Sequence, residues 1–367
     1  MREKAFVDIH CHTAGIGAGG SGCFISPALR RSWKYRVYLQ AFGVSEEELL
    51  KGGDGVVIRT LSERLSSSNR VSKAVILAMD GVVDSRGELD RARTEIFIPD
   101  EFTAAQVSLF PNLLFGASVN PGRRDALDRL DRAASDGAVL VKWLPSIQDI
   151  DPSDRRHIPF YRRLEALGLP LLTHTGNERS FTHAKNELGD PERLRLPLDE
   201  GVTVIAAHAA SNGRNNGEKN HLRFLRLAKS HPNLYADISA LTQANRLGHL
   251  EQLLRYEELH DRLVYGTDFP LINTGITSPW FHANRLGVGR LRDIIAESNP
   301  WDRDVLLKES LGVTEGIFAN SGRILKPESM GMKAETGENA GVNRGLRCLM
   351  PALSVNSAGI SIPTYEA

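Results

Sequence analysis

Eight short apolar runs, recurring along most of the chain, are the feature that most constrains the fold. Each is rich in β-branched residues and bounded by Gly, Pro or polar residues, and most are followed by a segment with helical periodicity. Few of them alternate strictly between apolar and polar residues, as expected of parallel strands that are covered on both faces. The expected strands are 5–10, 74–79, 114–119, 138–143, 170–174, 203–208, 233–238 and 263–268. This pattern predicts an α/β protein of the (β/α)8 TIM-barrel type.

The connections between the expected strands differ in length. Helices are expected at 123–135, 158–167 and 219–229. The stretch 13–70 is too long for a plain connection, and we interpret it as an inserted subdomain or lid above the barrel. It begins with the Gly-rich run 15–22, which we expect to be a mobile loop. We therefore divide the chain into a barrel, 1–325 with its insertion, and an irregular, poorly ordered tail, 326–367, rich in Gly, Asn and Ser.

The charge balance bears on the partners of the chain. Lys+Arg and Asp+Glu both number 45, and because the two signs are interspersed, we expect no nucleic-acid or membrane partner. The N-terminus lacks a signal-peptide pattern, and no run of about 18 apolar residues occurs. Three cysteines form no disulfide framework, which suits a reducing compartment. We expect a cytoplasmic protein that acts on a small molecule; a homodimer is a common arrangement for such barrels.

Potential metal ligands stand at the carboxyl ends of the expected strands, where barrel enzymes place their chemistry. His10 and His12 close the first strand, and residues two apart in an extended chain face the same side, so both imidazoles can converge on one ion. His174, His208 and Asp268 end the fifth, sixth and eighth strands. A single strand-end histidine is often structural, and a single aspartate often caps a helix. Their recurrence at successive strand ends indicates a shared metal site.

The motifs at these strand ends resemble those of the amidohydrolase superfamily, in particular its amidohydrolase-related branch. They are DIHCH, VKW, LLTHTG, VIAAHAA and YGTDFP, at the first, fourth, fifth, sixth and eighth strands, and the resemblance covers about residues 4–325. It implies that one divalent ion is bound by His10, His12 and Asp268. It also implies that His174 and His208 lie on or beside a second ion.

Lys142, at the end of the fourth strand, matches the lysine that is carboxylated and bridges two ions in superfamily members with two metals. A neutral, buried amine can react with carbon dioxide to form such an anion. Alternatively, Lys142 neutralises a substrate carboxylate or pairs with an acid, and one-metal relatives also carry a lysine near this position. We favour the bridge. The imidazole and carboxylate ligands suit Zn²⁺, one or two ions, with Mn²⁺, Fe²⁺ and Ni²⁺ as alternatives.

Asp268 and His208 are the candidate catalytic residues. A bound ion lowers the pKa of its water towards about 7 and polarises a substrate oxygen. Asp268 would then ligate the ion, accept the proton of the attacking water and pass it to the leaving group. His208 either ligates the second ion or, as in one-metal relatives, orients water or protonates an intermediate. Asp8, two residues before His10, either orients an imidazole or is a structural acid.

These residues favour a metal-dependent hydrolase that uses metal-activated water on an amide, lactone or related ester bond of a small molecule. The resemblance leaves a second enzyme class open: non-oxidative decarboxylases of aromatic or unsaturated acids, which use one metal and nearly the same ligands. A single metal beside a free Lys142 amine would favour that class. A third class is a barrel that binds metal or ligand without turnover, and the complete ligand set with a proton acceptor argues against it.

The substrate itself is not readable from the sequence, because the βα loops determine specificity. The loop 211–220 carries Arg214 and Lys219, which could meet an anionic substrate, although a solvated loop explains this composition equally well. The candidate pocket walls, for which core packing is the competing explanation, are Trp143, Phe181 and Trp280.

Overall fold

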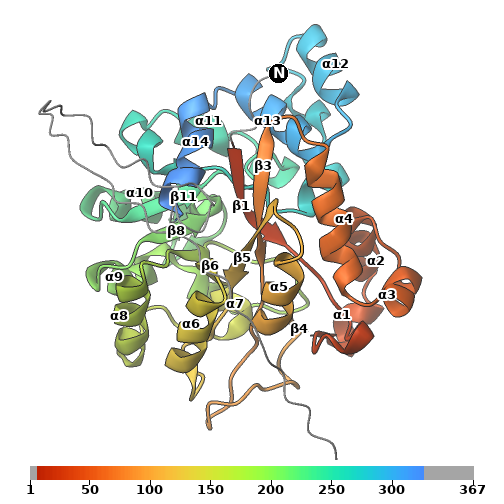
Figure 1. Ribbon diagram of the computed structural model, residues 1–367. Coiled ribbons are helices and arrows are strands. Elements are labelled where there is room, and N and C mark those ends of the chain that lie inside the picture. The colour runs from red at the N-terminus through yellow and green to blue at the C-terminus, as the bar shows by residue number, and fades with distance from the viewer. Residues whose placement is uncertain (1–5, 326–367) are drawn as a thin grey trace, which may run out of the picture. The chain divides into compact units, whose positions relative to one another are not determined.

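The computed structural model describes residues 6–325 as a parallel eight-stranded barrel surrounded by helices (Figure 1). The order of strands is β1-β3-β5-β6-β7-β8-β11-β12, and all seven neighbouring pairs are parallel. The strands are β1 (Phe6–His12), β3 (Val71–Leu77), β5 (Leu113–Ala117), β6 (Ala138–Trp143), β7 (Leu171–His174), β8 (Val204–Ala207), β11 (Leu234–Asp237) and β12 (Leu263–Val264). All eight predicted strands are present, so the predicted TIM barrel is confirmed. The predicted tail, 326–367, lies outside the described residues.

Apolar residues on both faces of the strands explain the weak alternation of the sequence. Leu140 and Leu172 belong to a buried cluster inside the barrel. Val141 and Leu171, their neighbours along the chain, belong to the larger cluster between the strands and the helices. Because successive residues of a strand face opposite sides, both faces of β6 and β7 are removed from water, as is usual for parallel sheets.

Backbone hydrogen bonds between β1 and the segment after β12 bring the two ends of the sheet together. The Asp268 N–H donates to the His10 carbonyl (3.0 Å), and the His12 N–H donates to the Phe269 carbonyl (2.9 Å). β12 is shorter than the predicted run 263–268, and beyond it the backbone turns at Asp268, which adopts a left-handed φ of 63°. The closure therefore places the carboxyl end of β1 beside Asp268.

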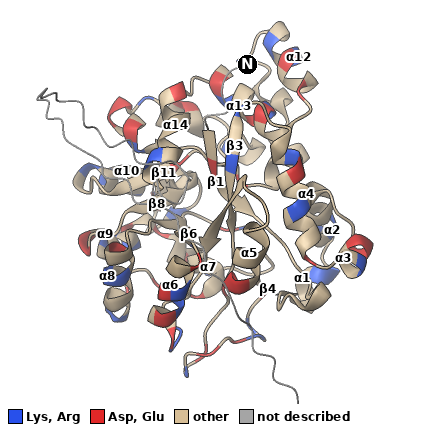
Figure 2. Cartoon of the chain, in the orientation of Figure 1, with Lys and Arg blue, Asp and Glu red and all other residues tan. Residues whose placement is uncertain are grey.

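Helices cover the outside of the barrel and alternate with its strands (Figure 1). The predicted helix 158–167 coincides with α8. α6 begins three residues later than the predicted helix 123–135, and α10 is displaced by one residue from the predicted helix 219–229. Figure 2 shows basic and acidic residues interspersed along α4, α6 and α12. No helix within residues 6–325 is long and apolar enough to cross a membrane. The helices are α1 (Pro27–Arg31), α2 (Trp33–Phe42), α3 (Glu46–Gly52), α4 (Gly55–Ser66), α5 (Asp100–Val107), α6 (Ala126–Ser135), α7 (Pro145–Gln148), α8 (Ile158–Leu167), α9 (Arg195–Asp199), α10 (Asn220–Ser230), α11 (His249–Leu253), α12 (Val288–Ala296), α13 (Pro300–Ser310) and α14 (Glu315–Ile324).

The long stretch 13–70 is only partly an insertion. Its last helix, α4, buries Val57, Ile58 and Leu61 and packs against β3, so it is the barrel's own helix after β1. The remainder contains α1 to α3 and β2 (Phe24–Ile25), which pairs with β4 (Ile96–Phe97). This remainder belongs to the same compact unit as the barrel.

Two contacts show where the inserted segment attaches. The Lys34 side chain, on α2, donates to the carbonyls of Arg179 and Phe181 (2.9 and 2.8 Å), in the loop that follows β7. The Gly-rich run 15–22 is anchored by Asp54, whose carboxylate accepts the backbone N–H groups of Ile16 and Gly17 (3.0 and 2.8 Å). The insertion therefore joins the loops at the carboxyl ends of the strands, and a buried acid holds the run that we expected to be mobile.

Candidate metal centre at the carboxyl end of the barrel

Three predicted ligands converge where the barrel closes. Nε2 of His10 lies 3.3 Å from Nε2 of His12. Oδ1 of Asp268 lies 3.5 Å from Nε2 of His10 and 3.3 Å from Nε2 of His12. His10 and Asp268 are buried, whereas His12 keeps some exposure. The two histidines share a face because they are two residues apart in β1, and the backbone turn at Asp268 brings in the carboxylate.

The orientation of His10 depends on Asp237, a residue that the sequence reasoning missed. Nδ1 of His10 lies 2.7 Å from Oδ2 of Asp237, the last residue of β11, which is fully buried. The hydroxyl of Ser239 donates to Oδ1 of the same carboxylate (2.5 Å). An acceptor at Nδ1 favours the tautomer whose Nε2 lone pair faces the candidate site. An acid at the end of the seventh predicted strand was the available signal.

His174 and His208 are oriented like His10: a neighbouring polar group lies at Nδ1, and Nε2 has no close hydrogen-bond partner among the described residues. Nδ1 of His174 lies 3.5 Å from Oε2 of Glu178, which sequence reasoning also missed. Nδ1 of His208 lies 2.8 Å from the Ser239 hydroxyl oxygen. The two imidazole rings are 5.2 Å apart between centroids, and Nε2 of His208 is 3.9 Å from Oδ2 of Asp268. Both histidines therefore join the site that His10, His12 and Asp268 form.

The site favours neutral imidazoles beside ionised carboxylates. Burial lowers the pKa of His12, and it lowers the pKa of His174 and His208 as well. Burial opposes ionisation of Asp268, yet the neighbouring histidines outweigh it and the pKa of that carboxyl is well below its usual range. Neutral imidazole and carboxylate are the forms that bind cations.

A comparison with family models decides the family of the chain. A model described as Amidohydrolase matches residues 91–287, more than half of the chain. The chain belongs to the amidohydrolase family. The match includes the strand ends that carry Lys142, His174, His208 and Asp268, whereas His10 and His12 precede it. None of the curated proteins compared with this amidohydrolase matches its sequence.

Solved structures with a similar fold were also found. An uncharacterised TIM-barrel protein from Bordetella bronchiseptica is 16% identical, with a TM-score of 0.52 over 87% of this chain and 99% of that one. A probable 2-pyrone-4,6-dicarboxylic acid hydrolase from Acinetobacter baumannii is 13% identical, with a TM-score of 0.51 over 89% and 100%. A 2,6-dihydroxybenzoate decarboxylase from Rhizobium is 15% identical, with a TM-score of 0.45 over 84% and 99%. Identities this low show only that the first two share the fold.

Lys142 of this amidohydrolase lies inside the site. Its Nζ is 2.9 Å from Nε2 of His10, and its side chain is only 1% exposed. Burial lowers the pKa of Lys142 to about 8, so a much larger fraction of this amine is neutral near pH 7 than for an exposed lysine.

Trp143, the next residue of β6, faces the other way and packs against Phe160 and Tyr161. Of the two explanations for Trp143, a pocket wall or core packing, the structure supports core packing, because strand alternation sends the indole into the core.

A divalent cation fits this set of atoms. The 3.3 Å between the Nε2 atoms of His10 and His12 suits two nitrogens that each lie about 2.0–2.1 Å from one zinc ion. Nε2 of His174 is buried without a hydrogen-bond partner among the described residues, as expected of a ligand atom. A second grouping, His10 with His208 and Asp237, brings together atoms that already bond to one another or to Ser239, and we interpret it as support for the imidazoles.

Asp8, Arg214 and Trp280, which the sequence analysis also considered, do not contribute to the cluster of ligands. Asp8 bonds away from the imidazoles: its carboxylate accepts the N–H of Thr267 (3.0 Å) and the indole N–H of Trp301 (2.9 Å). It is thus a structural acid that ties β1 to the segment after β12 and to α13. Arg214 and Trp280 are exposed, and Arg214 donates to the Gly217 carbonyl within its own hairpin (2.8 Å).

Proposed function

We propose that this amidohydrolase hydrolyses an amide, lactone or related ester bond of a small molecule, with a divalent cation and water. One observation carries the proposal: two imidazole nitrogens, from His10 and His12, converge with the Asp268 carboxylate within 3.5 Å, while Asp237 holds the far nitrogen of His10. A carboxylate behind a histidine is the usual support of a metal ligand. The location agrees, because barrel enzymes place their chemistry at the carboxyl ends of the strands.

In this proposal, the side chains of the centre form two neighbouring cation sites. His10, His12 and Asp268 would hold one cation, and we propose zinc because of the nitrogen and oxygen ligands. His174 and His208 would hold or adjoin a second, and a carboxylated Lys142 would be shared between the two. When bound, the cation supplies Lewis acidity, which polarises the scissile carbonyl and lowers the pKa of the attacking water.

Asp268 is the proposed proton acceptor for the attacking water. Its Oδ1 lies toward His10 and His12, whereas Oδ2 lies on the side of His208. A carboxyl whose pKa is well below its usual range is ionised near neutrality, so Asp268 has the free lone pairs that a proton acceptor needs. It then delivers the proton to the leaving nitrogen or oxygen. His208 would orient the water or substrate through Nε2, since its Nδ1 is engaged by Ser239.

A second candidate function rests on Lys142. Its Nζ lies 2.9 Å from the nitrogen of His10 that a cation would need. An amine that stays free beside a single cation would favour the alternative, non-oxidative decarboxylation of an aromatic or unsaturated carboxylic acid. A carboxylated Lys142 between two cations would favour hydrolysis. The two functions therefore predict different states of the same side chain.

Metal analysis combined with a substrate panel tests the proposal. Protein purified without chelator should carry about one to two equivalents of divalent metal per chain, and a His10→Ala, His12→Ala double variant should lose it. The metal-loaded protein is then incubated with lactones, esters, amides and aromatic acids, while acid release and carbon dioxide release are measured separately. Acid release that depends on metal supports hydrolysis, and carbon dioxide release supports the alternative. Protein that binds no metal at all would refute both.

A further inference from the structure

Three arginines are buried among residues 6–325, and two of them hold a carboxylate in the same way. Arg223 places Nε and Nη2 at 2.8 Å each from the two oxygens of Asp190. Arg123 uses the same two nitrogens on the carboxylate of Asp80. The Nε–Nη2 edge of a guanidinium matches the spacing of two carboxylate oxygens. In this protein, that edge is thus the way in which a buried arginine is neutralised.

Arg246 is the third buried arginine, and no carboxylate of the described residues binds its Nε–Nη2 edge. Its Nη1 donates to the hydroxyl of Ser211 (2.7 Å). Its Nε is buried without a partner, and it forms no ion pair with any carboxylate that the structure describes. A buried guanidinium without a directly paired carboxylate is costly. The open Nε–Nη2 edge can therefore receive an acceptor that is not part of residues 6–325.

Arg246 belongs to the candidate metal centre by position. It ends a short helical turn (Ala244–Arg246) in the connection after β11, the strand that carries Asp237. Its partner Ser211 donates its own N–H to the His208 carbonyl (3.0 Å). Burial lowers the pKa of Arg246, and the negative charges of Asp268, Glu178 and Asp237 act against that effect. The guanidinium thus lies within the electrostatic field of the site.

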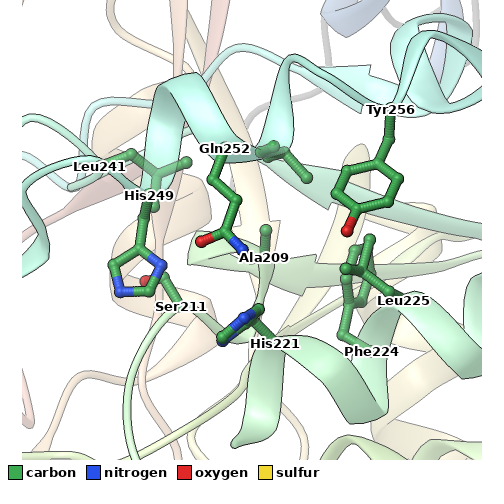
Figure 3. Close-up of a pocket in the computed structure, with 10 residues that line it drawn as sticks. Ala209, Ser211, His221, Phe224, Leu225, Leu241, His249, Gln252 and Tyr256 are labelled. Carbon is green, nitrogen blue, oxygen red and sulfur yellow. The ribbon is translucent and has the colours of Figure 1, made fainter.

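The same turn carries a second unpartnered donor. Gln243, three residues before Arg246, is buried, and its Nε2 has no partner among the described residues. Ser211 also lines a small cavity between α10 and α11, where Figure 3 shows it beside His249. That cavity measures about 20 Å³ and is lined mainly by apolar residues, so it has room for about one water molecule. It therefore has no room for a substrate carboxylate.

We infer that Arg246 binds a carboxylate group of the substrate through Nε and Nη2, and that the substrate is therefore a small carboxylic acid whose carboxylate lies apart from the bond that reacts. The inference rests on the proposed function for the reaction, but the binding it describes is measurable without turnover. Arg246 is a specificity-determining residue in this account, and Ser211 positions it.

A binding experiment on the metal-loaded protein tests the inference with benzoate as the probe and benzamide as its uncharged match. By calorimetric titration, benzoate should bind more tightly than benzamide, and Arg246→Gln should weaken benzoate binding about tenfold or more while leaving benzamide unchanged. Arg255→Gln is the control for loss of a positive charge, because Arg255 is exposed and forms no ion pair within the described chain. It should bind benzoate as the wild type does.

Two further variants keep the result interpretable. Arg246→Lys retains the charge but lacks the two-nitrogen edge, so it should also weaken benzoate binding; it replaces Arg246→Gln if that variant does not fold, as judged by circular dichroism. Ser211→Ala removes only the positioning hydroxyl and should weaken binding by a smaller factor. Equal benzoate affinity in the wild type and in a folded Arg246 variant would overturn the inference. So would inorganic phosphate that binds more tightly than benzoate in an Arg246-dependent way.

Turnover measurements separate this inference from the proposed function. Lactones and esters are tested in pairs, with a free carboxylate or with the corresponding methylamide. The wild type should favour the carboxylate member of a pair in kcat/KM, and Arg246→Gln should remove that preference mainly through KM. Hydrolysis without any such preference overturns the inference and leaves the proposed function standing. Arg246-dependent benzoate binding without hydrolysis of any pair supports the inference and contradicts the proposed function.

Discussion

Nζ of Lys142 lies 2.9 Å from Nε2 of His10, the nitrogen that the proposed cation also needs. Asp237 accepts at Nδ1 of His10, 2.7 Å away, so Nε2 carries the only lone pair of that imidazole. One lone pair cannot serve an ammonium and a cation together. Cation binding therefore requires Lys142 to move, to lose its proton or to become carboxylated, and the depressed pKa of this lysine favours the last two changes.

Replacement of Lys142 tests the bridging role. We expect Lys142→Met, which keeps the volume of the side chain, to lower the bound metal from about two equivalents to about one, because the shared ligand is lost. Elemental analysis measures the metal, and ¹³C NMR of protein supplied with labelled bicarbonate reports the carbamate. Lys229→Met, at an exposed position of α10, is the control. Unchanged metal content in Lys142→Met, with no carbamate signal in the wild type, would contradict the bridge.

Replacement of Asp268 tests the proton acceptor. Asp268→Asn should lower kcat about a thousandfold, since general base catalysis contributes about 10²–10⁴-fold. The folded structure should persist, because the amide has the same shape as the carboxylate. Activity is measured at saturating metal so that weaker binding is not mistaken for lost chemistry. Asp261→Asn, an exposed aspartate, should match the wild type, and a fully active Asp268→Asn would refute the role.

Replacement of Asp237 tests the support of His10. Asp237→Asn should weaken cation binding about 10–100-fold, because the amide no longer stabilises the imidazole through a charged hydrogen bond. Competition with a chromogenic chelator measures the affinity. The matched control is Asp293→Asn, on the exposed side of α12. Wild-type affinity in Asp237→Asn would show that the contact between His10 and Asp237 contributes only to the fold.

Trp301 tests the structural role of Asp8. Trp301→Phe should keep the stacking on Phe269 (ring centroids 5.0 Å apart) but lose the indole hydrogen bond to Asp8. A hydrogen bond to a charged, buried acceptor contributes about 1.5–3 kcal/mol, so the free energy of unfolding should fall by about that amount. Denaturant titration measures it. Trp280→Phe, whose indole is 66% exposed, should change stability by less than about 0.5 kcal/mol. Metal content should stay the same in both variants.

Thiol labelling tests the burial of Cys11 and Cys23. Both are buried, and burial raises the pKa of the Cys23 thiol to about 12. A raised pKa means less thiolate, so at about pH 8.5 iodoacetamide should leave both thiols unmodified in the folded protein and label them in guanidinium chloride. Mass spectrometry of the peptides identifies each site. Labelling of Cys23 in the folded protein at the rate of an unfolded peptide would contradict the buried placement.

The strands and most of the proposed ligands could be predicted because they depend on local properties of the chain. Apolar runs bounded by turn residues predicted all eight strands, and β6 agrees with the prediction at both ends. A strand end in a parallel barrel has a known location, so His10, His12 and Asp268 could be placed together before any contact was known. The predicted length of the insertion was too great, because α4 is amphipathic whether it belongs to a lid or to the barrel.

Only the tertiary structure shows which groups contact those ligands and orient them. Asp237 lies 227 positions from His10 in sequence, and an acid at a strand end does not by itself show which imidazole it contacts. The open edge of Arg246 is likewise invisible in the sequence, since Arg123, Arg223 and Arg246 differ only in whether folding brings a carboxylate to them. The sequence by itself determined the barrel and the residues at its strand ends, because periodicity and position are local. The orientation of each imidazole, and the lack of a carboxylate of the described residues at the Nε–Nη2 edge of Arg246, depend on how distant segments come together in the folded chain.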